Sequence, residues 1–265
     1  MPTYRMTVEY DGTKFSGWQV QRQSRTVQGV LTDALRRLAG HGDLVVRGAG
    51  RTDAGVHALA QVASVTCREP LAVERLLAAL ARELPADLAV RDLRQVEGRF
   101  HARHDALLRS YRYQLARRRS AFGKRYTWWV REPIDTRAMS AAAAHLTGRH
   151  DFAALSRRDP AQTSTVVVVE QCRVIDLGEL VLVRVVASHF LWGQVRRMVG
   201  ALVAVGRGEA RPDDVPEWLS GAVEPPVGAA PASGLFLEKV LFAGEPEELP
   251  PLLPVGVPWS GPVDA

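Results

Sequence analysis

The sequence predicts an α+β fold whose first half is ferredoxin-like. Over residues 3–96 the apolar pattern gives the order strand, helix, strand, strand, helix, strand, which is the split βαβ arrangement. The 265 residues are 46% hydrophobic and 24% charged. This composition is ordinary for a globular protein, and the length allows one large or two small domains with packed cores.

The first half begins with a half-buried strand over residues 3–10, in which apolar and polar side chains alternate up to the Asp11-Gly12 turn. Thr26 is the expected N-cap of a helix whose apolar face runs to Leu38. The other expected elements are strands at residues 44–46, 60–65 and 88–96 and a helix at residues 73–80.

In the second half, Asp135 or Thr136 is expected to cap a helix that ends at Leu146. The other expected elements are strands at residues 111–115, 164–170, 172–177, 180–187 and 235–240 and a helix at residues 195–203. Residues 246–265 are rich in proline and acidic residues and are expected to form a tail.

Positive charge is concentrated in one part of the chain. The net charge is +5, and the run from Arg99 to Arg131 holds ten Lys or Arg residues and one acidic residue, Asp105. Such a run is either a solvated basic face or a surface that contacts phosphates of a nucleic acid.

The sequence gives no sign of a membrane, a metal or a disulfide. No stretch approaches 18 apolar residues, and the N-terminus has no apolar signal-peptide core. Cys67 and Cys172 lie far apart, and no His/Cys cluster has metal-ligand spacing. We therefore expect a cytoplasmic protein with no metal and no membrane contact.

A glycine-rich stretch from Gly48 to Ala58 lies between two expected strands and carries one carboxylate, Asp53. Glycines allow tight turns and the close approach of a ligand. The stretch lacks the endings of a phosphate-binding loop. Asp53 is either a turn residue that bonds its own loop or a carboxylate that does chemistry, with Arg51 nearby to hold its charge.

The stretch Gly50–Ala58 resembles the signature of the tRNA pseudouridine synthase A family. Further blocks resemble that family in the same order, and they are Glu9–Gln19, Phe100–Arg103, Arg109–Tyr113, the helix around Arg196, and Ala230–Leu237. The resemblance implies two ferredoxin-like α/β subdomains that share a continuous, mostly antiparallel central sheet. We place them at residues 1–106 and 107–245, with the tail at residues 246–265.

The resemblance also implies a reaction, in which uridines 38, 39 and 40 of the tRNA anticodon stem-loop are isomerised to pseudouridine without a cofactor. Asp53 would be the nucleophile, attacking either C1′ or C6, and Arg196 would pair with it. Tyr111 would stack on the uracil and assist proton removal from C5, Leu235 would contact the base, and Arg51 would help extrude the nucleotide.

The implied partners are tRNA and a second copy of the chain in a homodimer. The basic run supplies the expected tRNA-binding residues, which are Arg103, Arg109, Arg112, Arg117, Arg118 and Arg119. The chain departs from the family pattern over Ser156–Thr165 and at Gln194 and Arg197. A non-catalytic tRNA-binding or tRNA-folding protein remains the alternative, and a nucleosidase is less favoured because no second carboxylate lies near Asp53 in sequence.

Overall fold

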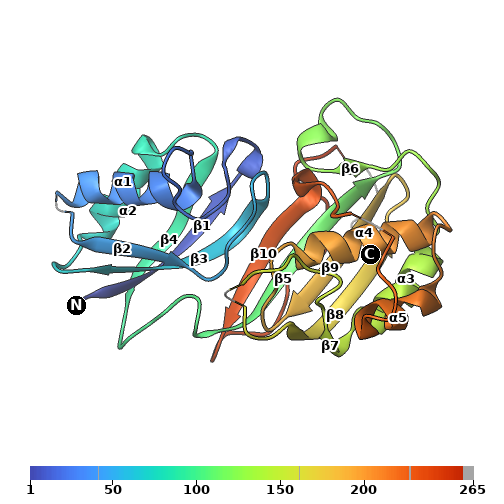
Figure 1. Cartoon of the computed structure of the whole chain (residues 1–265). Coiled ribbons are helices and arrows are strands. Elements are labelled where there is room, and N and C mark those ends of the chain that lie inside the picture. Colours follow the sequence, from blue (N-terminus) through green and yellow to red (C-terminus); the bar gives the residue numbers. More distant parts are fainter. Residues whose placement is uncertain (41, 161, 227, 259–265) are drawn as a thin grey trace. The chain divides into compact units, whose positions relative to one another are not determined.

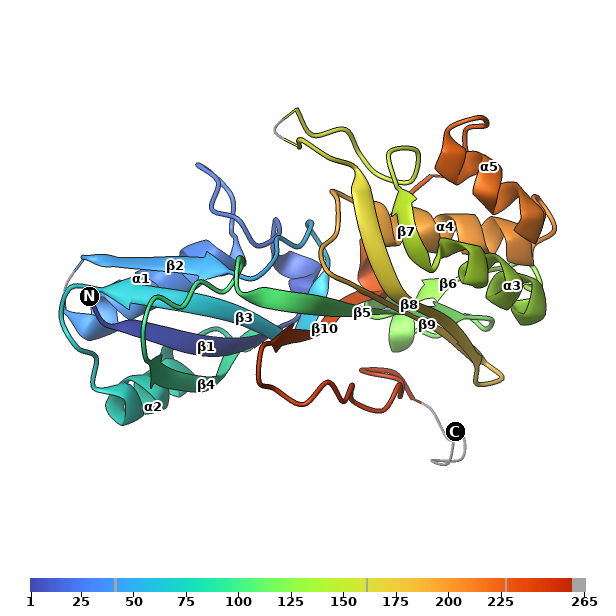
Figure 2. The same cartoon turned by 90° about the horizontal axis from the view of Figure 1, so that it is seen from below.

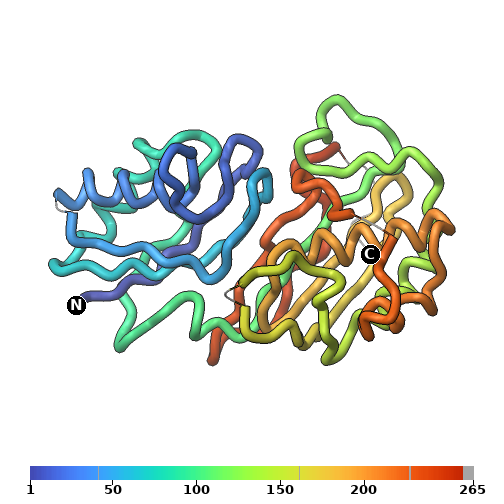
Figure 3. Tube along the Cα trace, in the orientation of Figure 1, coloured from blue at the N-terminus to red at the C-terminus, as the bar shows by residue number. Residues whose placement is uncertain are grey.

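The computed structural model describes residues 1–40, 42–160, 162–226 and 228–258, and its contacts divide the chain into two compact units (Figure 1, Figure 3). Unit 1 comprises Met1–Leu107 and Phe236–Glu247, and unit 2 comprises Leu108–Leu235 and the described residues from Glu248 onward. This division differs from the predicted one because the last strand groups with unit 1 and the tail segment groups with unit 2.

Unit 1 is ferredoxin-like, as the sequence predicts. Its elements are β1 (Thr3–Tyr10), α1 (Val27–Ala39), β2 (Leu44–Gly48), β3 (His57–Cys67), α2 (Val73–Glu83), β4 (Leu88–Val96) and β10 (Leu235–Phe242). The first four strands lie in the order β4-β1-β3-β2 with antiparallel pairing throughout. β10 pairs with β3 in parallel, with Phe236 opposite His57.

Local hydrogen bonding and backbone conformation set both ends of helix α1 in unit 1. The Thr26 side chain accepts a hydrogen bond from the Gly29 backbone N–H at 3.3 Å, which caps α1 as predicted. α1 ends at Gly40, whose φ of 74° suits glycine. Leu31 and Leu35 of α1 are fully buried, and α1 and α2 lie on the same side of the unit 1 strands (Figure 1).

Unit 2 is built around a second, mostly antiparallel set of strands. Its elements are β5 (Ala106–Ala116), β6 (Trp128–Trp129), α3 (Thr136–Leu146), β7 (Gly148–Asp151), β8 (Val166–Asp176), β9 (Leu180–Ala187), α4 (Gln194–Gly206) and α5 (Val215–Ser220). The order is β5-β9-β8-β7, with β6 parallel beside β5. The described residues therefore form an α+β fold of ten strands and five α-helices.

Two details of unit 2 bear on the predictions. Asp135 caps α3, since its carboxylate accepts hydrogen bonds from two backbone N–H groups of the first turn. The two strands expected at residues 164–170 and 172–177 are one strand, β8, whose register against β9 shifts between Val169 and Gln171. That bulge breaks the alternation of side chains and made the strand look like two. No helix among the described residues is long and apolar enough to cross a membrane.

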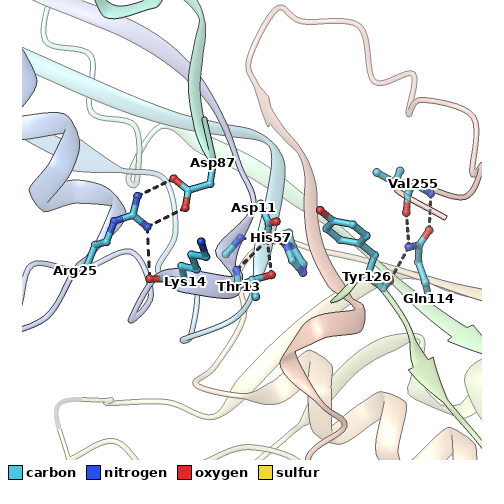
Figure 4. A network of polar contacts seen from close by, with 10 residues as sticks. Asp11, Thr13, Lys14, Arg25, His57, Asp87, Gln114, Tyr126 and Val255 are labelled. Atoms are coloured by element: carbon cyan, nitrogen blue, oxygen red, sulfur yellow. Dashed lines mark hydrogen bonds and ion pairs between the residues drawn. The ribbon is translucent and has the colours of Figure 1, made fainter. Parts of the chain in front are cut away.

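Residues 248–258 form a strap across the strands of unit 2, on the side opposite α3 and α4 (Figure 2). The Arg112 guanidinium donates hydrogen bonds to the carbonyls of Pro251 and Leu253. The Gln114 side-chain amide donates to the Val255 carbonyl at 2.9 Å and accepts from the Val255 N–H at 2.7 Å (Figure 4). The predicted tail is thus packed up to residue 258; its remaining residues, 259–265, lie outside the described chain.

We expect Gly256→Ala to loosen the strap. Gly256 has a φ of 66°, and an added Cβ would lie 2.7 Å from the Tyr126 ring. Gly244→Ala is the matched control, because Gly244 has a φ of 77° but no atom within 4 Å of the added Cβ. Both variants should lose about 1 kcal/mol of unfolding free energy from backbone strain, measured by urea denaturation. Only Gly256→Ala should also expose the strap to limited proteolysis, and equal protection in both would contradict the packing role.

Candidate active site

Asp53 lies in the loop between β2 and β3. Asp53 is half-buried. Arg51, which precedes it in the loop, is exposed, and Val56, which follows it, is buried. The Val56 N–H donates to the Asp53 carbonyl at 3.2 Å and closes a tight turn, in which Gly55 has a φ of 79°. The loop therefore holds the Asp53 backbone in one conformation at the end of the two strands.

A second loop, residues 11–18, supports the Asp53 loop by direct backbone contact. The Trp18 N–H donates to the Thr52 carbonyl at 3.1 Å. An added Cβ at Gly17 would lie 2.6 Å from the Thr52 carbonyl oxygen and 3.2 Å from the Asp53 carbonyl carbon. At Gly12 it would lie 2.0 Å from the Val56 carbonyl oxygen. The two loops fit together only because these positions lack side chains.

Buried polar side chains complete this support. The hydroxyls of Tyr10 and Thr52 are hydrogen-bonded at 2.8 Å. Burial raises the pKa of Tyr10 to about 12, although the bond to Thr52 opposes this shift, so the hydroxyl stays neutral. The Trp18 indole lies against Gly48, where an added Cβ would meet the ring at 2.5 Å. The packing of the Trp18 ring therefore supports the Asp53 loop in addition to the backbone hydrogen bonds.

The support loop is held at its outer end by charged groups (Figure 4). Arg25 binds both carboxylate oxygens of Asp87, at 2.7 and 3.0 Å, and its guanidinium lies 3.9 Å from the Phe15 ring centroid. The buried His57 Nδ1 lies 3.0 Å from the Gly12 N and 3.1 Å from an oxygen of Asp11. These contacts join the helix α1 entrance, the support loop and the start of β3.

In unit 2, Tyr111 and Leu235 are both buried, with 7% and 5% of their surfaces exposed. The Tyr111 ring on β5 meets the Phe190 ring edge to face, with centroids 5.1 Å apart. Phe190 was not among the predicted site residues, since its position in the loop before α4 gives no periodic signal. The contact fixes the orientation of the Tyr111 ring within unit 2.

Arg196 lies in the first turn of α4 and is tied to the segment before β10. Its Nε donates to the Ala230 carbonyl at 2.6 Å, and the Ala230 N–H donates to the Arg196 carbonyl at 2.9 Å. The Tyr113 hydroxyl donates to the adjacent Pro231 carbonyl at 2.7 Å. Burial raises the pKa of Tyr113, and the nearby Arg196 charge opposes this only in part. The sequence pattern assigned Tyr113 only to a strand face and gave no sign of its bond to Pro231.

Gln194, Arg197 and part of the Ser156–Thr165 segment, where the sequence predicts departures from the family pattern, lie around the start of α4. Gln194 is fully buried, and its side-chain oxygen accepts from the Leu191 N–H at 2.9 Å. In the Ser156–Thr165 segment, the Arg157 N–H donates to the Trp192 carbonyl at 2.8 Å, and its guanidinium lies 5.2 Å from the Trp192 ring centroid. Gln194 and Arg157 therefore both stabilise the turn that leads into α4. Arg197, three residues after Gln194 in the helix, is half-buried.

The six arginines predicted to bind tRNA fall into three groups. Arg109 and Arg112 are buried, with guanidinium groups bonded to backbone carbonyls, because the strand places them under the neighbouring segments. Arg117 and Arg118 form bidentate pairs with Asp176 and Glu179. Arg103 and Arg119 are exposed. The basic run thus serves the fold within β5 and reaches solvent on both sides of that strand, at Arg103 and Arg119.

The described residues contain no group of three or more His, Cys, Asp or Glu side chains that could hold a metal ion. A cavity of ≈ 550 Å³ in unit 2 lies between the end of α3, β7 and α5, and it includes His145 and His150. None of the predicted site residues lines it.

Comparison with known proteins tests the family resemblance of the sequence. The tRNA pseudouridine synthase family profile matches residues 6–105 and 142–243. The chain belongs to this family. It is 41% identical to tRNA pseudouridine synthase A of Pelobacter propionicus over 245 residues, which cover 91% of this chain and 100% of that protein.

Other members of the family are about as similar. The protein of the same name from Moorella thermoacetica is 41% identical over 91% of this chain and 100% of its own length. That from Syntrophotalea carbinolica is 42% identical over 92% of this chain and 97% of its own length. Among solved structures, a dye-decolorizing protein from V. cholerae covers 80% of this chain and 88% of its own at 11% identity, but its TM-score of 0.20 has no bearing on the fold.

The family match makes this chain an enzyme of the isomerase class that acts in tRNA pseudouridine synthesis. The Asp53 loop, Arg196 and Leu235 lie within the matched residues. Tyr111 lies between the two matched segments, on β5.

We expect Gly17→Ala to impair pseudouridine formation by displacing the Asp53 backbone. A shift of about 1 Å in a reacting group can cost about 100-fold in rate, and the added Cβ has no room beside Thr52. Gly40→Ala is the matched control, because Gly40 has a similar φ of 74° with nothing within 4 Å. The measurement is single-turnover pseudouridine formation with thermal unfolding in parallel. Equal rates in the two variants would show that the backbone contact does not position the Asp53 loop for the reaction.

Proposed function

We propose that this chain isomerises uridines 38, 39 and 40 in the anticodon stem-loop of tRNA to pseudouridine. The observation that carries the proposal is Asp53, a half-buried carboxylate on a loop whose backbone is fixed on both sides. A polyanionic RNA gains nothing from a carboxylate in its binding site, so this residue favours chemistry over simple binding.

The proposed reaction uses Asp53 as the nucleophile. An oxygen of its carboxylate bonds to C1′ as the N1–C1′ bond breaks, and the electron pair of that bond leaves with the uracil. The uracil rotates, C5 bonds to C1′, and the Asp53 carboxylate departs. C5 then loses its proton and N1 gains one, so no atom is added or lost overall. Attack at C6 of the base is the other route to a covalent Asp53 adduct.

The residues of unit 2 have proposed roles that agree with their contacts. Arg196 pairs with the Asp53 carboxylate in this mechanism, and the bond from its Nε to the Ala230 carbonyl holds the side chain in place. Tyr111 supports the flipped base and assists proton removal from C5, with Phe190 fixing its ring. Leu235 contacts the base, and the exposed Arg51 helps extrude the nucleotide.

The proposal includes a homodimer that works in the cytoplasm without a cofactor. Of the predicted phosphate contacts we retain the exposed Arg103 and Arg119, whereas the burial of Arg109 and Arg112 favours a structural role for them. The basic run alone would fit a non-catalytic tRNA-binding protein equally well, but the family match makes this chain an enzyme. The loss of activity in one variant tests whether Asp53 carries out the chemistry.

That variant is Asp53→Asn, which we expect to abolish pseudouridine formation while tRNA affinity stays within a few-fold. The amide keeps the shape of the side chain but cannot attack a carbon centre as a carboxylate does. Asp43→Asn is the matched control, because Asp43 is an exposed carboxylate of the same unit. Tritium release from tRNA labelled at C5 of uridine measures the reaction. Retention of a tenth of the wild-type rate in Asp53→Asn would exclude the nucleophilic role.

We expect Arg196→Lys to slow the chemical step by roughly 10- to 1000-fold, or ~1.4–4 kcal/mol in barrier, with little change in tRNA binding. Lysine keeps the charge but lacks the planar group that bonds the Ala230 carbonyl and a carboxylate together. Arg197→Lys, one residue further along α4, is the control and should react normally. If both variants react at the same rate under single-turnover conditions, Arg196 does not orient the carboxylate.

A further inference from the structure

Residues 117–131, which we call the basic lobe, connect β5 to the segment before α3. The lobe contains six basic residues and no acidic residue. It includes β6 and the short turn Gly123–Arg125. The family profile does not match this part of the chain, since its two matched segments end at residue 105 and resume at residue 142.

The charges of the lobe divide into two sets. Arg117 and Arg118 are neutralised by Asp176 and Glu179, as described above. Arg119 and Arg131 are exposed and have no ion pair among the described residues. Both lie over the Trp129 ring, with their guanidinium carbons 5.7 and 5.1 Å from its centroid. The indole therefore holds two uncompensated guanidinium groups at one place on the surface.

An exposed aromatic ring accompanies these charges. Phe122 is 81% exposed, more than any other large apolar side chain of the described residues except Met1. It directly precedes the turn that carries Lys124 and Arg125. A solvent-exposed apolar ring among cations does not stabilise the isolated chain. Bases of unpaired nucleotides, however, stack on such rings while basic groups bind the phosphates.

The base of the lobe is fixed, so its tip is presented in one arrangement. The Gln114 side chain donates to the Tyr126 carbonyl at 2.7 Å and binds the strap at Val255 (Figure 4). The Thr127 hydroxyl donates to the Gly123 carbonyl at 2.9 Å. Gly123 lies against Val257 of the strap, within 3.2 Å of an added Cβ. A surface ordered in advance loses less entropy when a ligand binds.

We propose that the basic lobe is an RNA-binding surface for the tRNA substrate, outside the site of the target nucleotide. Arg119 and Arg131 bind phosphates, and the Phe122 ring stacks on an unpaired base. This inference rests on the proposed function in that tRNA is the partner. The lobe begins after Ala116, five residues along β5 from Tyr111, which is about 16 Å in a strand. It therefore contacts nucleotides that flank the uridine that reacts.

RNA is favoured over a protein partner by the composition of the surface. Protein interfaces centre on a larger apolar patch with fewer charges, whereas here one exposed ring stands among basic groups with no acid between residues 117 and 131. A protein-binding lobe would leave tRNA affinity unchanged when its residues are replaced, and that outcome is part of the test.

The experiment measures the affinity of the full-length chain for full-length tRNA as a function of salt, in an Asp53→Asn background that stops turnover. Arg119→Ala with Arg131→Ala should weaken binding by about tenfold and make the dependence of log affinity on log salt shallower by about 1 per arginine. Phe122→Ala should weaken binding by about 5- to 100-fold without changing that slope, because stacking releases no counterions.

The control is the pair Arg118→Gln with Glu179→Gln, which removes an arginine from the same lobe without changing the net charge. It should bind like the parent protein. Arg119→Lys with Arg131→Lys keeps the charges and should keep the salt slope, which guards against a folding defect. Wild-type affinity and slope in both the arginine double variant and Phe122→Ala would overturn the inference.

Failure of the proposed function looks different from failure of this inference. If the wild-type chain forms no pseudouridine at these positions, the binding comparison among the variants still stands. If the wild-type chain is active and the lobe variants bind tRNA normally, the chemistry stands and the RNA-binding surface is excluded.

Discussion

The close contact between two loop backbones in unit 1 is the constraint on which the candidate active site depends. Gly17 lies against the peptide groups of Thr52 and Asp53 with no space for even one methyl group. Because backbone atoms rather than flexible side chains meet there, the loop has no easy way to relax. The contact also places the neighbouring residues. The Gly17 carbonyl accepts a hydrogen bond from the Val27 N–H at the start of α1, and the Trp18 ring packs against Gly48. One contact thus links the entrance of a helix to the carboxylate.

Unit 2 uses the same principle with different groups. The Ala230-Pro231 segment is held by the Arg196 side chain on one helix and the Tyr113 hydroxyl on a strand, so the approach to Leu235 is fixed by two donors from different elements. An added Cβ at Gly234 would meet the Tyr113 ring at 2.6 Å, which shows how closely the segment follows the strand. An arginine that is already held by one such bond loses little further freedom when it makes another.

The sequence predicted the parts of this structure that rest on local signals. The caps at Thr26 and Asp135 and the order of elements in unit 1 are confirmed, because side-chain oxygens and apolar periodicity act within a few residues. The strap could not be predicted, since its hydrogen bonds join residues about 140 apart in the chain, such as Gln114 and Val255. For the same reason the burial of Arg112 was missed. Tyr113 was placed correctly on a strand face, but its partner Pro231 is equally remote.

The burial of arginines within the basic run shows that positive charge along a sequence does not by itself identify a binding surface. In β5 the two arginines stand three residues apart, at positions 109 and 112, and Arg112 stands directly opposite Arg184 in the register. Two buried like charges side by side would be unfavourable, but the strap supplies carbonyl oxygens to each, from Pro251 and Leu253 to Arg112 and from Pro250 to Arg184. Prolines suit this segment because they lack the N–H that would compete for those carbonyls. The strap thus satisfies Arg112 of the run and, through Val255 and Val257, fixes the base of the lobe that presents Arg119 and Arg131.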